Sequence, residues 1–117
     1  MTIQVSILGL DRTGQSIGLA LKSALQPIDR VGSDEDSLRE RSAIQSGALD
    51  RAIHNLYDCV EKADIVVLNT PYSRSKELLE ALRDVFKEGA VILYTGRMPL
   101  RVKEYASTVL PENRYLL

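Results

Sequence analysis

The feature that most constrains this chain is a run of four apolar residues, Ile65-Val66-Val67-Leu68. A strand with one face in water alternates apolar and polar residues. An unbroken run therefore predicts burial on both faces and a central place in a parallel sheet. Other short apolar runs recur along the chain, and amphipathic stretches with helical spacing separate them. Strands that alternate with helices and connect by right-handed crossovers form a doubly wound, mainly parallel sheet. We therefore predict the α/β class, with a Rossmann-like arrangement in a single domain.

The expected elements follow the order β-α-β-α-(β)-α-β-α-β-α-β, in which the third strand is very short. Strands are expected at residues 3–8, 30–32, 52–53, 64–69, 90–94 and 114–117. Helices are expected at 14–25, from Ser37 to a stop before Gly47, at 55–62, after a Ser73 cap, and from Pro99 to a stop before Pro111. Ser37 and Glu40 have the spacing of a capping box. In the first helix, Ile17, Leu21 and Leu25 share the apolar face.

Length and composition exclude several classes of protein. A chain of 117 residues is expected to form one domain, 1–117, and its net charge of −1 lacks the cationic surplus of a broad nucleic-acid surface. No apolar run approaches the ~20 residues of a membrane helix, and no secretory signal is visible. The single cysteine, Cys59, excludes an intramolecular disulfide, and with one histidine, His54, no metal site is expected. These features predict a cytoplasmic protein without membrane or nucleic-acid partners.

A glycine-containing bend joins the first predicted strand to the first predicted helix. Gly9 and Gly14 match the first and third positions of the template G-x-G-x-x-G, in which the bend and the helix N-terminus hold a pyrophosphate. The second position holds Asp11, whose side chain narrows the space and whose charge opposes an anion by about 1–4 kcal/mol at ~4 Å. The alternative is a strand-to-helix turn that binds no nucleotide. The expected cofactor contacts here are Gly9, Leu10, Asp11, Arg12, Thr13 and Gly14.

An acid, Asp34, ends the second predicted strand 20 residues after Gly14. A carboxylate at this place accepts hydrogen bonds from the hydroxyl groups of an adenosine ribose. Because it would repel a 2′-phosphate, it favours NAD over NADP. The alternative is a solvated turn acid within the cluster Asp34-Glu35-Asp36.

Two further turns follow the central strands. Thr70-Pro71 is expected to border the nicotinamide end of the dinucleotide, and a proline that merely ends a strand is the alternative. The segment Tyr94-Thr95-Gly96-Arg97 is expected at the same cleft, where Arg97 could attract an anion; an exposed turn arginine is the alternative. Cys59 is expected in the core and His54 at the surface, neither with a visible catalytic partner.

Six segments carry a family resemblance. They are Ile7-Leu8-Gly9-Leu10, Gly14-Gln15-Ser16-Ile17-Gly18-Leu19-Ala20-Leu21, Val31-Gly32-Ser33-Asp34, Gly47-Ala48-Leu49-Asp50-Arg51, Ala63-Asp64-Ile65-Val66-Val67-Leu68-Asn69-Thr70-Pro71 and Phe86-Lys87-Glu88-Gly89-Ala90-Val91-Ile92. With these residues the chain resembles the N-terminal nucleotide-binding domain of the prephenate dehydrogenase family, within the 6-phosphogluconate-dehydrogenase-like group. The likeness covers nearly the whole chain.

The resemblance implies an oxidoreductase that passes a hydride from prephenate or arogenate to NAD or NADP, a step of tyrosine biosynthesis. It also implies a longer protein, whose C-terminal helical domain forms a homodimer and completes the site for a small anionic substrate. Where the family has Asp, Ser and Lys after the fifth strand, this chain has Tyr94, Arg97 and Pro99, so no catalytic residue is assigned. The family's His-Pro segment would lie beyond Leu117. We expect the domain alone to lack the complete activity.

A second hypothesis is a nucleotide-sensing or protein-interaction module that kept the fold and lost catalysis. Asp11 in the bend and Tyr94 after the fifth strand favour it. A third hypothesis, a flavodoxin-like phosphoacceptor, would need an acid pair beside Asp11 and a lysine after the fifth strand, and Asn69-Thr70 and Tyr94-Thr95 supply neither.

Overall fold

The computed structural model describes residues 2–117 and contains a six-stranded sheet in which every pairing is parallel. The strands are β1 (Ile3–Leu8), β2 (Ile28–Ser33), β3 (Arg51–Ala52), β4 (Ile65–Leu68), β5 (Val91–Tyr94) and β6 (Tyr115–Leu116). Their spatial order is β3-β2-β1-β4-β5-β6, with the unbroken apolar run of β4 in the centre beside β1. The predicted α/β class and doubly wound sheet are confirmed.

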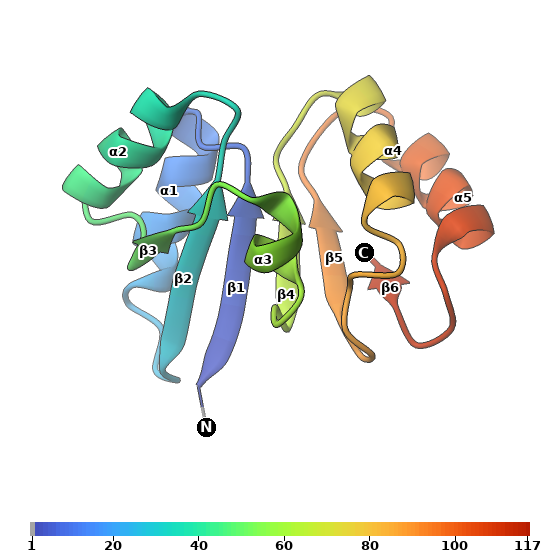
Figure 1. Ribbon diagram of the computed structural model, residues 1–117, viewed down its shortest axis with the longest axis horizontal. Coiled ribbons are helices and arrows are strands. Elements are labelled where there is room, and N and C mark those ends of the chain that lie inside the picture. The colour runs from blue at the N-terminus through green and yellow to red at the C-terminus, as the bar shows by residue number, and fades with distance from the viewer. Residues whose placement is uncertain (1) are drawn as a thin grey trace.

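The helices divide between the two faces of the sheet (Figure 1). They are α1 (Arg12–Leu21), α2 (Ser37–Gln45), α3 (Leu56–Val60), α4 (Tyr72–Ala81) and α5 (Pro99–Val109). Helices α1 and α2 cover one face, and α3, α4 and α5 cover the other. One core cluster, with Phe86, Leu79 and Val102 among its members, joins the sheet to α3, α4 and α5. The other cluster, with Ile7, Leu10 and Ala43 among its members, joins the sheet to α1 and α2.

The register brings the carboxyl ends of four strands to one level. Leu8 at the end of β1 is paired with Ser33 of β2 on one side and with Leu68 of β4 on the other. Leu68 is in turn paired with Tyr94, the last residue of β5. The loops that follow these strands therefore start from a common edge, which is where open α/β sheets bind their ligands.

Helix α1 differs from its predicted range of 14–25. It begins at Arg12 because the Asp11 side chain caps it, and it ends at Leu21. After Leu21 the backbone tightens into bonds between residues three apart, and Pro27 disfavours a helical conformation in the residue before it. Leu25, predicted on the apolar face, is consequently fully exposed at the surface.

Two predicted caps are also wrong. Helix α2 starts at Ser37 as expected, but its cap is Asp36, whose side chain accepts from the Leu38 N–H. Glu40 instead accepts from the backbone N–H of Asp34, because its nearly buried carboxylate faces the end of β2. Helix α4 starts at Tyr72, one residue before the expected Ser73 cap, and no side chain caps it.

Candidate functional site

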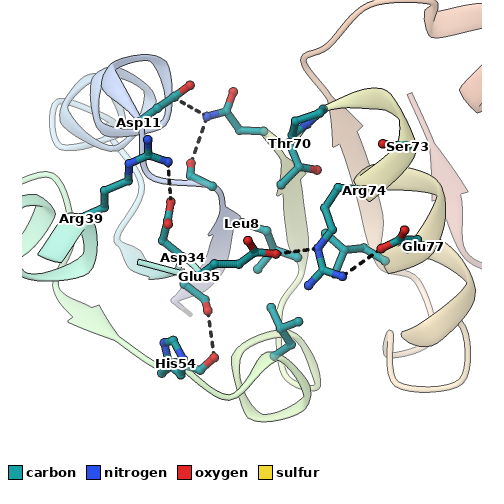
Figure 2. A pocket seen from close by; sticks show the side chains of 16 residues that line it. Leu8, Asp11, Asp34, Glu35, Arg39, His54, Thr70, Ser73, Arg74 and Glu77 are labelled. Carbon is teal, nitrogen blue, oxygen red and sulfur yellow. Dashed lines mark hydrogen bonds and ion pairs between the residues drawn. The ribbon is translucent and has the colours of Figure 1, made fainter. Parts of the chain in front are cut away.

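A cleft of about 630 Å³ opens at the carboxyl ends of β1, β2 and β4 (Figure 2). This volume lies within the range of small-molecule sites. Five of the nine predicted cofactor contacts line it, namely Gly9, Asp11, Asp34, Thr70 and Pro71. The remaining four belong to the adjoining bend: Leu10 is buried in the core, Arg12 and Thr13 lie in the exposed first turn of α1, and Gly14 is buried beneath it.

The bend from β1 into α1 depends on two glycines. Gly9 has a φ of +103°, and a Cβ placed there would lie 2.0 Å from the Asn69 carbonyl oxygen. A Cβ on Gly14 would lie 2.0 Å from the carbonyl oxygen of Gly9. Both obstacles are backbone atoms, which cannot rotate away as a side chain can. The two glycines therefore hold β1, α1 and the end of β4 closer together than any other residue would allow.

Asp34 joins the loop after β2 to the glycine bend. Its side chain is only 6% exposed; Oδ2 accepts from the Leu10 N–H at 2.7 Å and Oδ1 accepts from the Asp36 N–H at 2.8 Å. Each carboxylate oxygen has a second lone pair. The acid thus positions the bend and still has acceptor capacity where it lines the cleft.

Asp11 caps α1 at the place where the template has its second glycine. Its Oδ1 accepts from the Gly14 N–H at 3.0 Å and from the Asn69 side-chain amide at 2.7 Å. The Gly14 hydrogen bond is the main reason why the pKa of the Asp11 carboxyl lies below its usual value; partial burial opposes it and the Asn69 bond adds to it. The carboxylate is therefore held in its charged form at the N-terminus of α1.

Two arginines that sequence reasoning did not single out line the cleft beside these acids. Arg39, from α2, lies 3.8 Å from Oδ2 of Asp34. Arg74, from α4, reaches across to Glu35 in the loop after β2 at 3.1 Å and pairs with Glu77 on its own helix (Figure 2). The cleft is thus lined by paired charges together with apolar side chains such as Leu8, Leu56 and Leu78.

His54 also lines the cleft, next to β2. Its side chain is 64% exposed, as predicted, but Nδ1 lies 2.9 Å from Oε2 of Glu40, a partner that the sequence did not suggest. Glu40 in turn accepts from the Asp34 N–H, so the histidine is linked through one carboxylate to the loop that carries the acid.

Some expected features lie elsewhere. Tyr94 and Arg97, predicted at the cleft, are not among its lining residues; the Tyr94 hydroxyl donates to the Arg97 carbonyl instead. Cys59 is buried as expected, and this burial raises the pKa of its thiol to about 11. Within residues 2–117, no cluster of three or more potential metal ligands occurs, and none of the helices is long and apolar enough to span a membrane.

The cleft residues that the sequence analysis did not predict differ in whether the sequence contained a usable signal for them. Ser73, Arg74 and Glu77 come within six residues of Pro71, so a predicted helix starting at Tyr72, with Pro71 as its N-cap, would have placed them near the same edge. Arg39 and His54 come from a helix and a loop far along the chain, and only the folded arrangement brings them together.

The fold and cleft define a doubly wound α/β domain whose ligand position is the edge shared by β1, β2 and β4. A family model described as "Prephenate dehydrogenase, nucleotide-binding domain" matches residues 17–116. The chain belongs to this family. The match begins after the bend, so the Asp11 segment lies outside it.

A curated relative agrees with this assignment, and two solved structures share the fold. A curated prephenate dehydrogenase from Lactococcus lactis subsp. cremoris is 30% identical over 105 residues, which cover 89% of this chain and 29% of the relative. A prephenate dehydrogenase from A. aeolicus, solved with hydroxyphenyl propionate and NAD+, has a TM-score of 0.83 at 20% identity over 96% of this chain and 40% of that one. An arogenate dehydrogenase from Synechocystis has a TM-score of 0.79 at 20% identity, over 92% of this chain and 37% of that one.

The structural likenesses, at this level of identity, show the shared fold. This chain corresponds to about 29% of the length of the curated relative and about 40% of the solved A. aeolicus chain.

Proposed function

We propose that this chain is the NAD-binding domain of a prephenate dehydrogenase-like oxidoreductase. The observation that carries the proposal is the position of Asp34: one nearly buried carboxylate lines the cleft and also holds the bend through the Leu10 N–H. A dinucleotide site needs an acceptor for the ribose hydroxyl groups and a bend that binds the diphosphate, at a fixed distance from each other. The hydrogen bond between Asp34 and the Leu10 N–H fixes that distance. That the A. aeolicus relative was solved with NAD+ supports the same cofactor.

The roles of the residues follow from their places at the sheet edge. Gly9, Leu10, Gly14 and the backbone N–H groups of Arg12 and Thr13 form the diphosphate position, with Asp11 at its rim. Asp34 accepts from the adenosine ribose. Thr70 and Pro71, beyond the central strand, border the nicotinamide end. When bound, NAD supplies the hydride acceptor of the reaction, and this domain binds and orients it.

Asp34 also favours NAD over NADP, because a carboxylate facing the ribose repels a 2′-phosphate. Arg39 lies 3.8 Å from that carboxylate and reduces the repulsion in part. We therefore expect NADP to bind more weakly than NAD rather than not at all.

The whole protein's reaction is part of the proposal and rests on the family. Its substrate would be prephenate, arogenate or a similar small anion, and its product would serve tyrosine biosynthesis. The proposal also includes a homodimer and a cytoplasmic location. The alternative, a module that lost catalysis, draws on Asp11 and Tyr94, but the family match and the cleft at the sheet edge favour the dehydrogenase domain.

We also propose that a further helical domain accompanies this one. One face of the sheet supports this: α1 and α2 pack near β1 to β3, whereas on β5 the residues Val91 and Leu93 stay half-buried. Tyr115 of β6 is paired with Val91, hence points to the same side, and is 52% exposed. An apolar surface of this kind suits packing by another segment.

The test is calorimetric titration of the 117-residue chain with NADH and NADPH. We expect micromolar binding of NADH, weaker binding of NADPH, and a loss of NADH affinity of about tenfold or more in Asp34→Ala, since a charge-assisted hydrogen bond is lost. Asp58→Asn, a change to an exposed acid in the first turn of α3, serves as the control and should bind as the parent does. Absence of binding with both cofactors would contradict the proposal.

A further inference from the structure

The N-terminus of α1 carries an anion that belongs to the chain itself. The Asp11 carboxylate accepts from the Gly14 N–H at 3.0 Å, and the Asn69 side-chain amide donates to the same oxygen at 2.7 Å. Asn69 is itself fixed, because its amide also donates to the Gly9 carbonyl at 3.0 Å and its Oδ1 accepts from Thr95 at 2.8 Å. Residues after β1, β4 and β5 thus cooperate to hold this carboxylate in place.

We propose that Asp11, held by Asn69, is an internal competitor of the diphosphate and sets the affinity of the bend for dinucleotides. The inference rests on the proposed function, since it concerns the same cleft. It goes beyond that proposal, which places Asp11 only at the rim of the diphosphate position, because it names the hydrogen bonds through which the carboxylate competes with the diphosphate.

The competition follows from the number of donors. The first N–H groups of a helix bind either a side-chain carboxylate or an external anion. Gly14 has one N–H, and in this structure Asp11 uses it. A diphosphate arriving at the bend must displace that bond, and the displaced carboxylate stays within a few ångströms of the incoming negative charge. The depressed pKa of Asp11 agrees with a carboxylate that is well stabilised where it stands.

The displacement is feasible because Asp11 is exposed and lines the cleft. Its side chain can turn toward solvent without disturbing the core. Asn69 can keep its bond to the Gly9 carbonyl while it releases the acid, so the bend retains its shape. The two glycines that shape the bend take no part in the exchange.

The experiment compares NADH affinity in the parent chain, Asp11→Asn and Asp11→Gly, with Asp58→Asn as the matched change of charge. Asn at position 11 keeps a capping side chain and removes only the charge, whereas Gly also removes the cap. We expect Asp11→Gly to bind NADH about tenfold more tightly and Asp11→Asn to gain less, because it removes the charge but keeps a side chain on the Gly14 N–H; Asp58→Asn should be unchanged. Adenosine, which has no phosphate, should bind all four proteins equally.

Each other outcome contradicts the inference. Equal NADH affinity in all four proteins would overturn it and leave the proposed function standing. A gain for adenosine as large as the gain for NADH would show that Asp11 acts on the whole cleft rather than on the diphosphate. Failure of every variant to bind NADH would contradict both proposals, and because Asp11→Asn retains a cap, loss of folding would not account for it.

Discussion

Two polar networks in this molecule tie side chains to backbone groups, and they differ chiefly in their exposure. In the first, Arg30 of β2 donates to the carbonyl oxygens of Gly18, Gly47 and Ala48 at 3.1, 2.7 and 3.1 Å, and it pairs with Asp50. The Arg30 side chain is 8% exposed. In the second, Asp11 bonds Gly14 and Asn69 at the open edge of the cleft.

The comparison shows how similar bonds serve different ends. The carbonyl groups of Gly18 and Ala48, which accept from the buried arginine, are themselves buried, so losing this donor is costly and the network holds α1 and the segment after α2 to β2. At the cleft edge, the groups that bond Asp11 can instead bond water or a ligand, so breaking the bonds to Asp11 costs little free energy. We therefore expect changes around Arg30 to alter the free energy of unfolding, and changes around Asp11 to alter binding.

The largest effect is expected from Arg30→Met. Methionine fills much of the same volume but donates no hydrogen bond, which leaves the buried carbonyl groups of Gly18 and Ala48 and the half-buried one of Gly47 without this partner. Urea unfolding should show a loss of about 2–4 kcal/mol, because each buried carbonyl left without a donor costs about 1–3 kcal/mol. NADH binding by the folded fraction should be unchanged. A loss of stability below about 1 kcal/mol, or a change in NADH affinity, would contradict the contrast drawn between the two networks.

Asp50→Asn is expected to have a smaller effect on the free energy of unfolding, and this effect should depend on pH. The side-chain hydrogen bond from Arg30 is the main cause that holds the pKa of Asp50 below its usual value of 3.8. A lowered folded-state pKa contributes stability above the unfolded-state pKa, and that contribution is lost as the pH falls through the folded-state value. The parent should therefore be more stable than the variant at neutral pH, and the two should converge below about pH 4.

Urea midpoints measured across the acid range test this convergence, with Asp58→Asn as the control for a change of charge at an exposed site. A difference between parent and Asp50→Asn that stays constant down to the acid limit would show that the ionised pair contributes nothing.

The sequence predicted the features that depend on local rules. The run in β4 indicated a central strand because burial on both faces requires apolar residues throughout. Gly9 was predicted because the turn needs a residue free of a Cβ, and the structure gives it a φ of +103°. Asp34 was placed at the end of its strand by spacing alone, although its bond to the Leu10 N–H was not foreseen.

What the sequence did not predict depends on tertiary contacts or on a choice between two local signals. Arg39, Arg74 and His54 reach the cleft from separate elements, and no spacing rule links them. Asp11 carried a usable signal, because aspartate is a favoured N-cap and the Gly14 N–H lies three residues on. Considered only as a departure from a glycine template, the same residue was not recognised as the cap that starts α1.

The central claim is that the 9–14 bend holds a diphosphate while Asp34 holds the adenosine ribose. Backbone amide chemical shifts, followed by NMR as NADH is added to the chain, test it most directly. The account predicts that the largest changes fall on residues 9–14, followed by 34–35 and 69–71. Changes confined to α5 and β6, or none at millimolar NADH, would contradict it.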